Sequence, residues 1–199
     1  MTGAKRAMAV GGLVGPAAFV TAWSVLGAST EGYSPVHDAI SRLAASGATT
    51  RVGMSAGFAV FGAGMTLYAA ALRSALPGPA WTMAVATGVA TLGVAALPLE
   101  TSVGDRFHYV AAAAGYGTLA ALPMVAGRSL ARRGRRGWAR YSTATGAVSA
   151  VCVLASAIGP ASGLFQRAGL TVVDVWVVAS AVEILRRPHG YAPVSAGRT

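Results

Sequence analysis

Residues 107–127, FHYVAAAAGYGTLAALPMVAG, contain no aspartate, glutamate, lysine or arginine. A transmembrane helix needs roughly 20 mainly apolar residues to cross about 30 Å of hydrocarbon, and this stretch supplies them. Four further uncharged stretches of similar length occur in the chain, and a weaker one contains Asp174 and Glu183. The pattern predicts an all-α bundle of six transmembrane helices, at about 7–28, 52–72, 80–99, 107–127, 142–161 and 169–185. The strands of a membrane barrel would alternate apolar and polar residues, and such alternation is absent from the sequence.

The composition of the chain agrees with a membrane protein and excludes the main alternatives. Of the 199 residues, 54% are hydrophobic and 11% are charged, whereas a typical soluble domain has about 25% charged residues. Disordered chains are less hydrophobic and more highly charged. The single cysteine, Cys152, allows neither an internal disulfide nor a thiolate metal cluster. We expect one six-span domain over residues 1–190 and a flexible cytoplasmic tail at 191–199.

The basic residues predict the orientation, because cytoplasmic loops retain lysine and arginine. With the N-terminus inside, the cytoplasmic segments carry Lys5, Arg6, Arg73, Arg128, Arg132, Arg133, Arg135, Arg136, Arg140, Arg186, Arg187 and Arg198. The outer loops carry Arg42, Arg51, Arg106 and Arg167. We therefore expect a multi-pass protein of the cell membrane with both termini in the cytoplasm.

The basic segments allow two other interpretations. Lys5 and Arg6 before an apolar run are typical of a secretory signal peptide, but several glycines and Pro16 dilute that run, which favours a retained span. The net charge of +10 and the RRGRRGWAR segment at 132–140 are also found in nucleic-acid-binding proteins. In a membrane protein, such a segment is better explained as a loop beside anionic lipid headgroups. We expect the lipid bilayer as the partner, and no nucleic acid.

The first outer loop, at about 29–51, carries several polar side chains. Ser34 followed by Pro35 is typical of a helix start, and Gly47 of a helix end, which predicts a short amphipathic helix at 36–45. His37 and Ser41 would share one face of this helix, and Asp38 and Arg42 the next face. One interpretation is an interfacial helix with an ordinary Asp38–Arg42 surface ion pair. The other is a lid over an outward-facing cavity, with Asp38 directed inward.

The loop at 100–106 adds Glu100 and Asp105, and His108 opens the fourth span. Asp105 stands three residues after Ser102, which is the spacing of a helix-capping pair. Glu100 has no comparable local explanation, so it is the stronger candidate for a functional carboxylate. We expect His108 to be either a neutral structural residue or a contributor to a site at the outer face.

The last span holds Asp174 about five residues from its start. An aspartate at such a depth costs about 2.5–3.5 kcal/mol on insertion scales, so it normally has a partner in the protein or in a water-filled cavity. Arg167 lies seven residues earlier on nearly the same helical face. Glu183 would lie on the opposite face, and its spacing to Arg186 and Arg187 predicts an ion pair at the inner interface.

The segment GYSPVHDAISRLAASG at 32–47 resembles the membrane-protein family catalogued as domain of unknown function 998. The residues that carry the resemblance are Gly32, Tyr33, Ser34, Asp38, Ser41 and Leu43. LPLETSVGDRFHYVAA at 97–112 and GLFQRAGLTVVDVW at 163–176 also resemble the family, although Glu100 stands where a shorter acid or a small polar residue is expected. The resemblance covers most of the chain and implies a multi-span integral membrane protein. It brings no established reaction.

Three classes of function remain open on the sequence alone. The first is a membrane-embedded enzyme or binding protein for an isoprenoid or lipid amphiphile, for example one that catalyses acid-assisted terpene cyclisation or isomerisation. In this class the candidate catalytic residues are Asp38, Glu100 and Asp174, and the candidate substrate-binding residues are His37, Ser41, Arg42, His108 and Arg167. The second is a small proton-coupled transporter that uses Asp174 as a relay. The third is a non-catalytic accessory membrane protein.

The motifs of soluble enzymes are missing from the sequence. It contains no glycine-rich phosphate loop, no paired-cysteine zinc spacing and no HExxH motif. Only three histidines are available as metal ligands, and His189 lies in the inner tail. We therefore expect neither a metal site nor a nucleotide cofactor.

Overall fold

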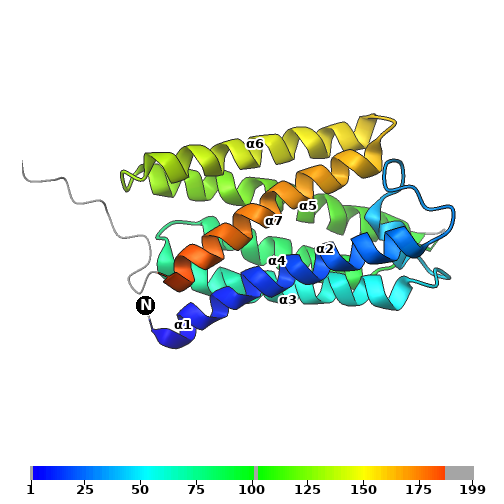
Figure 1. Ribbon diagram of the computed structural model, residues 1–199, viewed down its shortest axis with the longest axis horizontal. Coiled ribbons are helices and arrows are strands. Elements are labelled where there is room, and N and C mark those ends of the chain that lie inside the picture. The colour runs from blue at the N-terminus through cyan, green and yellow to red at the C-terminus, as the bar shows by residue number, and fades with distance from the viewer. Residues whose placement is uncertain (1, 101–102, 187–199) are drawn as a thin grey trace, which may run out of the picture.

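The computed structural model describes residues 2–100 and 103–186 of the chain, and within these ranges every regular element is a helix. The predicted tail at 191–199 lies outside them. The elements in chain order are α1 (Gly3–Ala7), η1 (Met8–Val10), α2 (Gly11–Ser29), η2 (Ile40–Ala44), α3 (Arg51–Ala75), α4 (Ala80–Ala96), α5 (Val103–Ala131), α6 (Arg136–Ile158) and α7 (Ser162–Arg186). The prediction of an all-α protein is confirmed for the described residues (Figure 1).

Five helical segments are long and apolar enough to cross a membrane, which indicates a multi-pass membrane protein. They are Gly3–Ser29, Arg51–Ala75, Asp105–Ala131, Arg136–Ile158 and Ser162–Arg186. The segment predicted at 80–99 is the exception, because α4 ends at Ala96 and is a shorter apolar helix. The residue before a proline disfavours the α conformation, and Leu97 precedes Pro98. The last span, which was the weakest in the sequence, is a helix of 25 residues.

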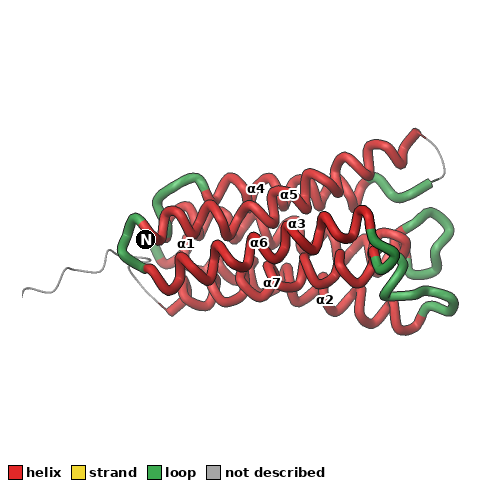
Figure 2. The backbone as a smooth tube through the Cα atoms, turned by 90° about the horizontal axis from the view of Figure 1, so that it is seen from above, coloured by secondary structure: helices red, strands yellow, loops and turns green. Residues whose placement is uncertain are grey.

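The long helices run up and down, and each packs against the next one along the chain (Figure 1). Helix α7 also packs against α2, α3 and α5, so it closes the bundle. The tube in Figure 2 shows the loops gathered at the two ends of the rod. We call the end with residues 30–50, 97–100 and 159–161 the loop end, and the opposite end the basic end.

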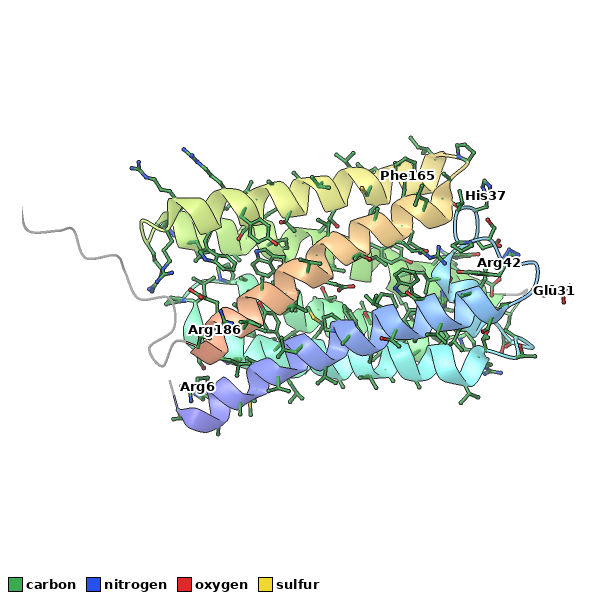
Figure 3. The ribbon with its side chains drawn as sticks, in the orientation of Figure 1. Arg6, Glu31, His37, Arg42, Phe165 and Arg186 are labelled. Carbon is green, nitrogen blue, oxygen red and sulfur yellow. The ribbon has the colours of Figure 1, made fainter. Side chains whose placement is uncertain are left out.

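Charged residues separate between these ends. The basic end carries Lys5, Arg6, Arg73, Arg128, Arg132, Arg133, Arg135, Arg136, Arg140 and Arg186. In Figure 3, Arg6 and Arg186 lie at the basic end, whereas Glu31, His37 and Arg42 lie at the loop end. Glu183 was expected to pair with Arg186 or Arg187, and Arg187 lies outside the described residues. The structure shows an ion pair of Glu183 with Arg135 of the α5–α6 turn, at 3.6 Å, because the turn brings that guanidinium to the end of α7.

Small residues let α2 and α3 approach closely. A Cβ atom on Gly64 would lie 2.6 Å from the carbonyl oxygen of Gly11 and 2.9 Å from the Cα atom of Gly15. Membrane helices gain little from burying apolar surface, since lipid tails are equally apolar, so this close packing is a main source of their association.

Hydrogen bonds between helices are the second source of helix association. Tyr68 of α3 bonds Ser180 of α7 at 2.6 Å. The indole nitrogen of Trp176 donates to the Ser142 hydroxyl at 2.8 Å, which joins α7 to α6. Each bond satisfies a buried polar group that lipid cannot satisfy.

Candidate functional site

The first loop contains a turn and a short 3₁₀ helix in place of the predicted amphipathic α-helix at 36–45. The Asp38 carboxylate accepts a hydrogen bond from the Ser34 backbone N–H at 2.8 Å, and Ala39 is extended, with φ −65° and ψ 147°. Aspartate side chains that bond nearby backbone groups compete with helix formation. The helix η2 therefore begins only at Ile40. The predicted Asp38–Arg42 ion pair is present, at 3.8 Å.

Arg167 of α7 holds this loop against the bundle. Its side chain is 6% exposed, and its Nη1 atom lies 2.9 Å from each of the carbonyl oxygens of Pro35, Asp38 and Gly163. The guanidinium also donates to the Tyr33 hydroxyl and lies over the Trp23 ring, 5.4 Å from its centroid. Several carbonyl dipoles and aromatic faces thus compensate one buried cation.

The Tyr33 hydroxyl accepts a hydrogen bond from Arg167 at the edge of this group of contacts. Burial raises the pKa of the Tyr33 hydroxyl above its ordinary value, and the charge of Arg167 partly offsets that increase. The hydroxyl therefore stays protonated at neutral pH, and it donates to the Ala39 carbonyl at 3.2 Å. Tyr33 links Arg167 to the start of η2.

Gln166 is a second tether, and the sequence did not identify it. Its Oε1 atom accepts the Ile40 backbone N–H at 2.9 Å, and its Nε2 atom donates to the Tyr116 hydroxyl of α5. The available signal was weak: a glutamine beside Arg167 at the start of an apolar span. His37 completes the attachment, because its Nδ1 atom lies 2.8 Å from the Pro160 carbonyl oxygen.

We expect Gly163→Ala to weaken this attachment. A Cβ atom at Gly163 would contact the Asp38 carbonyl oxygen and lie 2.8 Å from that of Pro35. Such overpacking costs about 1–3 kcal/mol, measured as a lower midpoint of thermal unfolding in detergent. The matched control is Gly117→Ala in α5, where a Cβ atom meets nothing within 4 Å. Equal midpoints for both variants would contradict the close contact.

An open cleft lies at the loop end, with a volume of about 710 Å³. Five of the eight predicted site residues line it, namely His37, Asp38, Ser41, Arg42 and Glu100. Asp105 and Tyr109 of α5 also line the cleft. The structure thus brings together residues that are more than 50 positions apart in the chain.

Hydrogen bonds join the two sides of the cleft. The Ser46 hydroxyl donates to Oε1 of Glu100 at 2.8 Å, and the Ser46 backbone N–H donates to the Leu99 carbonyl at 2.9 Å. Oδ1 of Asp105 accepts the Glu100 backbone N–H at 2.6 Å. Asp105 therefore has a structural role here, and Ser102, its predicted capping partner, lies outside the described residues. The second Glu100 oxygen makes no hydrogen bond to any described residue.

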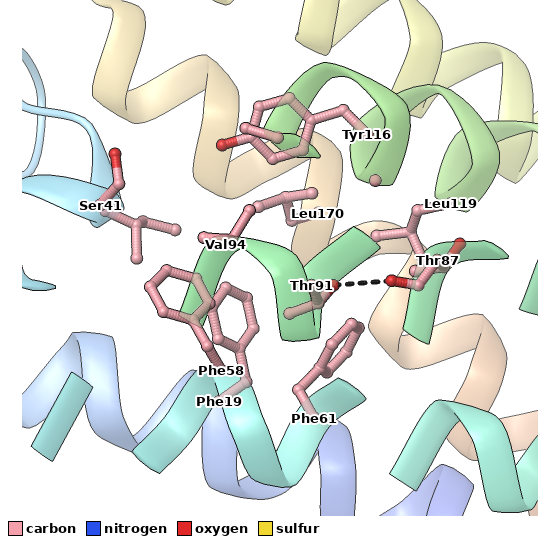
Figure 4. Close-up of a pocket in the computed structure, with 13 residues that line it drawn as sticks. Phe19, Ser41, Phe58, Phe61, Thr87, Thr91, Val94, Tyr116, Leu119 and Leu170 are labelled. Atoms are coloured by element: carbon pink, nitrogen blue, oxygen red, sulfur yellow. Dashed lines mark hydrogen bonds between the residues drawn. The ribbon is translucent and has the colours of Figure 1, made fainter. Parts of the chain in front are cut away.

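A smaller apolar cavity lies inside the bundle, next to the cleft. It has a volume of about 40 Å³ and is lined by rings and aliphatic side chains of α2, α3, α4, α5 and α7, among them Phe19, Phe58, Phe61, Val94, Tyr116 and Leu170 (Figure 4). Ser41 of η2 lines both this cavity and the cleft. The Ser41 side of η2 is therefore the partition between a polar hollow and an apolar one.

The other three predicted site residues lie elsewhere. His108 is 1% exposed, and its Nδ1 atom lies 2.6 Å from the Leu97 carbonyl oxygen, so it caps the end of α4. The Arg167 guanidinium donates its hydrogen bonds to carbonyl groups of the first loop. Asp174 is 3% exposed in the middle of α7, and neither of its carboxylate oxygens has a hydrogen-bond partner among the described residues. The expected pairing of Asp174 with Arg167 is not seen there.

Comparison with known proteins places the chain in a family. No curated protein and no solved structure matches it. The model of the DUF998 family, described as a protein of unknown function, matches residues 13–183, from the start of α2 to the end of α7. The matched region includes the whole first loop and every residue that lines the cleft and the cavity. The chain therefore belongs to the DUF998 family of proteins of unknown function.

Proposed function

We propose that all six long helices cross the cell membrane, with both termini in the cytoplasm. The concentration of lysine and arginine at the basic end supports this orientation. At 1.5 Å per residue, the 17 residues of α4 span about 25 Å, and residues 97–99 extend the chain to the loop end. In this topology the cleft opens to the outside.

We further propose that the protein binds an isoprenoid or lipid amphiphile, with the polar head in the cleft and an apolar segment in the cavity. The observation that carries the proposal is the position of Ser41 in the wall of both hollows. A water molecule needs about 10–15 Å³ by this measure of volume. The cavity of about 40 Å³ therefore suits a short hydrocarbon segment.

The charges that line the cleft favour some head groups of the bound amphiphile over others. Three carboxylates, from Asp38, Glu100 and Asp105, face the cleft, and among the described lining residues Arg42 carries the one guanidinium. This balance favours an amine or hydroxyl head over a phosphate, since like charges repel across a shared site. If the bound amphiphile reacts, Glu100 and Asp38 are the groups in place to give or take a proton. Isomerisation or cyclisation of an isoprenoid is compatible with that chemistry.

Binding of matched probes tests the proposal. Farnesylamine, farnesol and farnesyl phosphate share one chain and differ in the head. We expect the amine and the alcohol to bind the purified protein at least about tenfold more tightly than the phosphate, a difference of about 1.4 kcal/mol. Isothermal titration calorimetry in detergent measures the three affinities.

Two charge-neutralising variants make this test specific. Glu100→Gln keeps a hydrogen-bond acceptor for Ser46 but removes the charge, so it lowers the affinity for the amine. Glu31→Gln removes an exposed carboxylate at the same end that does not line the cleft, and leaves the affinity unchanged. Tight binding of the phosphate, or an equal effect of both variants, would refute the assignment.

A second candidate function rests on Asp174, and it is proton-coupled transport. A buried carboxyl group without a hydrogen-bond partner, in the middle of a membrane helix, is typical of a proton relay. Leu170, one turn earlier on α7, lines the apolar cavity. Proton uptake by liposomes that contain the purified protein tests this candidate, with Asp174→Asn as the variant that stops the flux.

A further inference from the structure

A second depression of the surface lies at the basic end and plays no part in the proposed amphiphile site. It has a volume of about 550 Å³ and is formed by the start of the chain and by helices α3 and α4. We call it the basic groove. Its lining includes Lys5, Thr66, Arg73, Ser74, Trp81 and Val85.

The groove carries two unneutralised cations. Lys5 and Arg73 line it, and no aspartate or glutamate does so among the described residues. The Arg73 guanidinium lies over the Trp81 ring, 4.7 Å from its centroid. Within the described part of the chain, neither side chain forms an ion pair or donates a hydrogen bond. No described residue therefore uses their N–H donors, which can serve a ligand.

The contact between the Arg73 guanidinium and the Trp81 ring restricts the position of the Arg73 charge. A cation over an indole ring is attracted by the ring electrons, and the contact limits the rotamers of the long arginine side chain. Tryptophan also favours the boundary between hydrocarbon and headgroups. In the proposed orientation, the Trp81 ring therefore favours a position of the cations near the phosphates of the phospholipids.

The wall of the groove continues toward the middle of the bundle as an apolar surface. Ala70 and Val85 line the groove beside the cations, and Val89, one turn after Val85 on α4, is 59% exposed. An acyl chain can lie along these residues while its phosphate contacts Lys5 and Arg73. A free phosphate ion would use only the cations and would leave this apolar wall uncovered.

We propose that the basic groove binds an anionic phospholipid, with the phosphate between Lys5 and Arg73 and an acyl chain along α3 and α4. In the proposed orientation this lipid belongs to the cytoplasmic leaflet. The site is independent of the cleft at the loop end, so either can fail without affecting the other. Lysines and arginines near a membrane surface strengthen the binding of anionic lipid.

Native mass spectrometry tests the proposal, with phosphatidylglycerol and phosphatidylcholine of identical chains as the probes. We expect the purified protein to retain phosphatidylglycerol in preference to phosphatidylcholine. The double variant Lys5→Gln/Arg73→Gln lowers this retention about tenfold. The control Arg128→Gln/Arg186→Gln removes two exposed charges at the same end that do not line the groove, and retention stays unchanged.

Four results would overturn the assignment. Equal loss in the control variant would show a diffuse attraction of the basic end for anions. Equal retention of phosphatidylcholine would show that the phosphate charge is not recognised. Displacement of phosphatidylglycerol by millimolar inorganic phosphate would identify a free anion as the ligand. Arg73→Lys, which keeps the charge, retains the lipid if charge is the determinant, and its failure to do so would also contradict the proposal.

Discussion

Arg167→Met is expected to detach the first loop from α7 and to lower the free energy of unfolding by about 3–5 kcal/mol. The substitution removes the donor shared by the carbonyl groups of Pro35, Asp38 and Gly163 and by the Tyr33 hydroxyl. A buried polar group left without its partner costs about 1–3 kcal/mol. Several buried polar groups lose their hydrogen-bond donor at once, so this is the largest loss of stability that we expect from a single substitution at the loop end.

Two measurements follow this change. Intrinsic tryptophan fluorescence records the midpoint of thermal unfolding, and limited trypsin digestion records cleavage after Arg42, which becomes faster when the loop is released. Arg167→Lys should give an intermediate midpoint, because an ammonium group keeps the charge but lacks the planar fork of donors. The matched control is Arg106→Met, since Arg106 is exposed at the same end. If Arg167→Met behaves like the control, the loop does not depend on Arg167.

Asp174→Leu is expected to have the opposite effect, a gain of about 1–3 kcal/mol in the free energy of unfolding. Both carboxylate oxygens are buried without a hydrogen-bond partner among the described residues, and leucine branches at the same atom with two methyl groups in place of the two oxygens. An unsatisfied buried polar group costs about 1–3 kcal/mol, which leucine does not incur. Asp174→Asn keeps an unsatisfied polar group, so its stability should remain near that of the parent protein.

The two Asp174 variants also separate stability from function. If Asp174 is a proton relay, both variants stop proton flux in liposomes, although only the leucine variant is more stable. Glu31→Gln serves as the control that removes an exposed carboxylate. A leucine variant that is markedly less stable would mean that the carboxyl group has a partner in the native membrane protein. Flux that survives both substitutions would exclude the relay.

The positions of the helices could be predicted because the membrane imposes a length and an apolar composition on each of them. The uncharged run at 107–127 falls within α5, and the stretches on either side of it fall within or close to their helices. The limits were less accurate where a polar residue continues a helix, as at the start of α6. Asp174 made the last span look weak, yet α7 is helical throughout Ser162–Arg186, because one buried polar side chain does not interrupt the backbone hydrogen bonds.

The first loop was predicted less well, because its structure depends on contacts with a distant helix. Ser34 and Pro35 have the local signature of a helix start, but the carboxylate of Asp38 bonds the Ser34 N–H and the chain becomes extended at Ala39. The attachment of η2 to Gln166, which is 126 residues away, has no local signal. The gathering of His37, Asp38, Arg42 and Glu100 was foreseeable, since their segments all lie at one end of the bundle.

The apolar cavity could not be predicted, because a hollow depends on how side chains from five helices fill the interior. The sequence made Asp174 a candidate catalytic residue because of its depth in the predicted span, yet Asp174 lines neither hollow. Phe19, Phe58 and Phe61 are ordinary apolar residues of membrane helices in the sequence. Only their packing identifies them as the wall of a cavity.

The position of Ser41 between the polar cleft and the apolar cavity has an electrostatic consequence. Water in the cleft screens the carboxylates there, whereas the phenylalanine rings on the far side offer no dipoles that can reorient. The interaction energy of two charges varies inversely with the effective dielectric constant, which is about 80 in water and about 20 or less near a protein interior. A polar bond of a ligand that lay beyond the Ser41 hydroxyl, on the side of the cavity, would therefore experience the electric field of Asp38 and Glu100 several times more strongly than the same bond in the cleft.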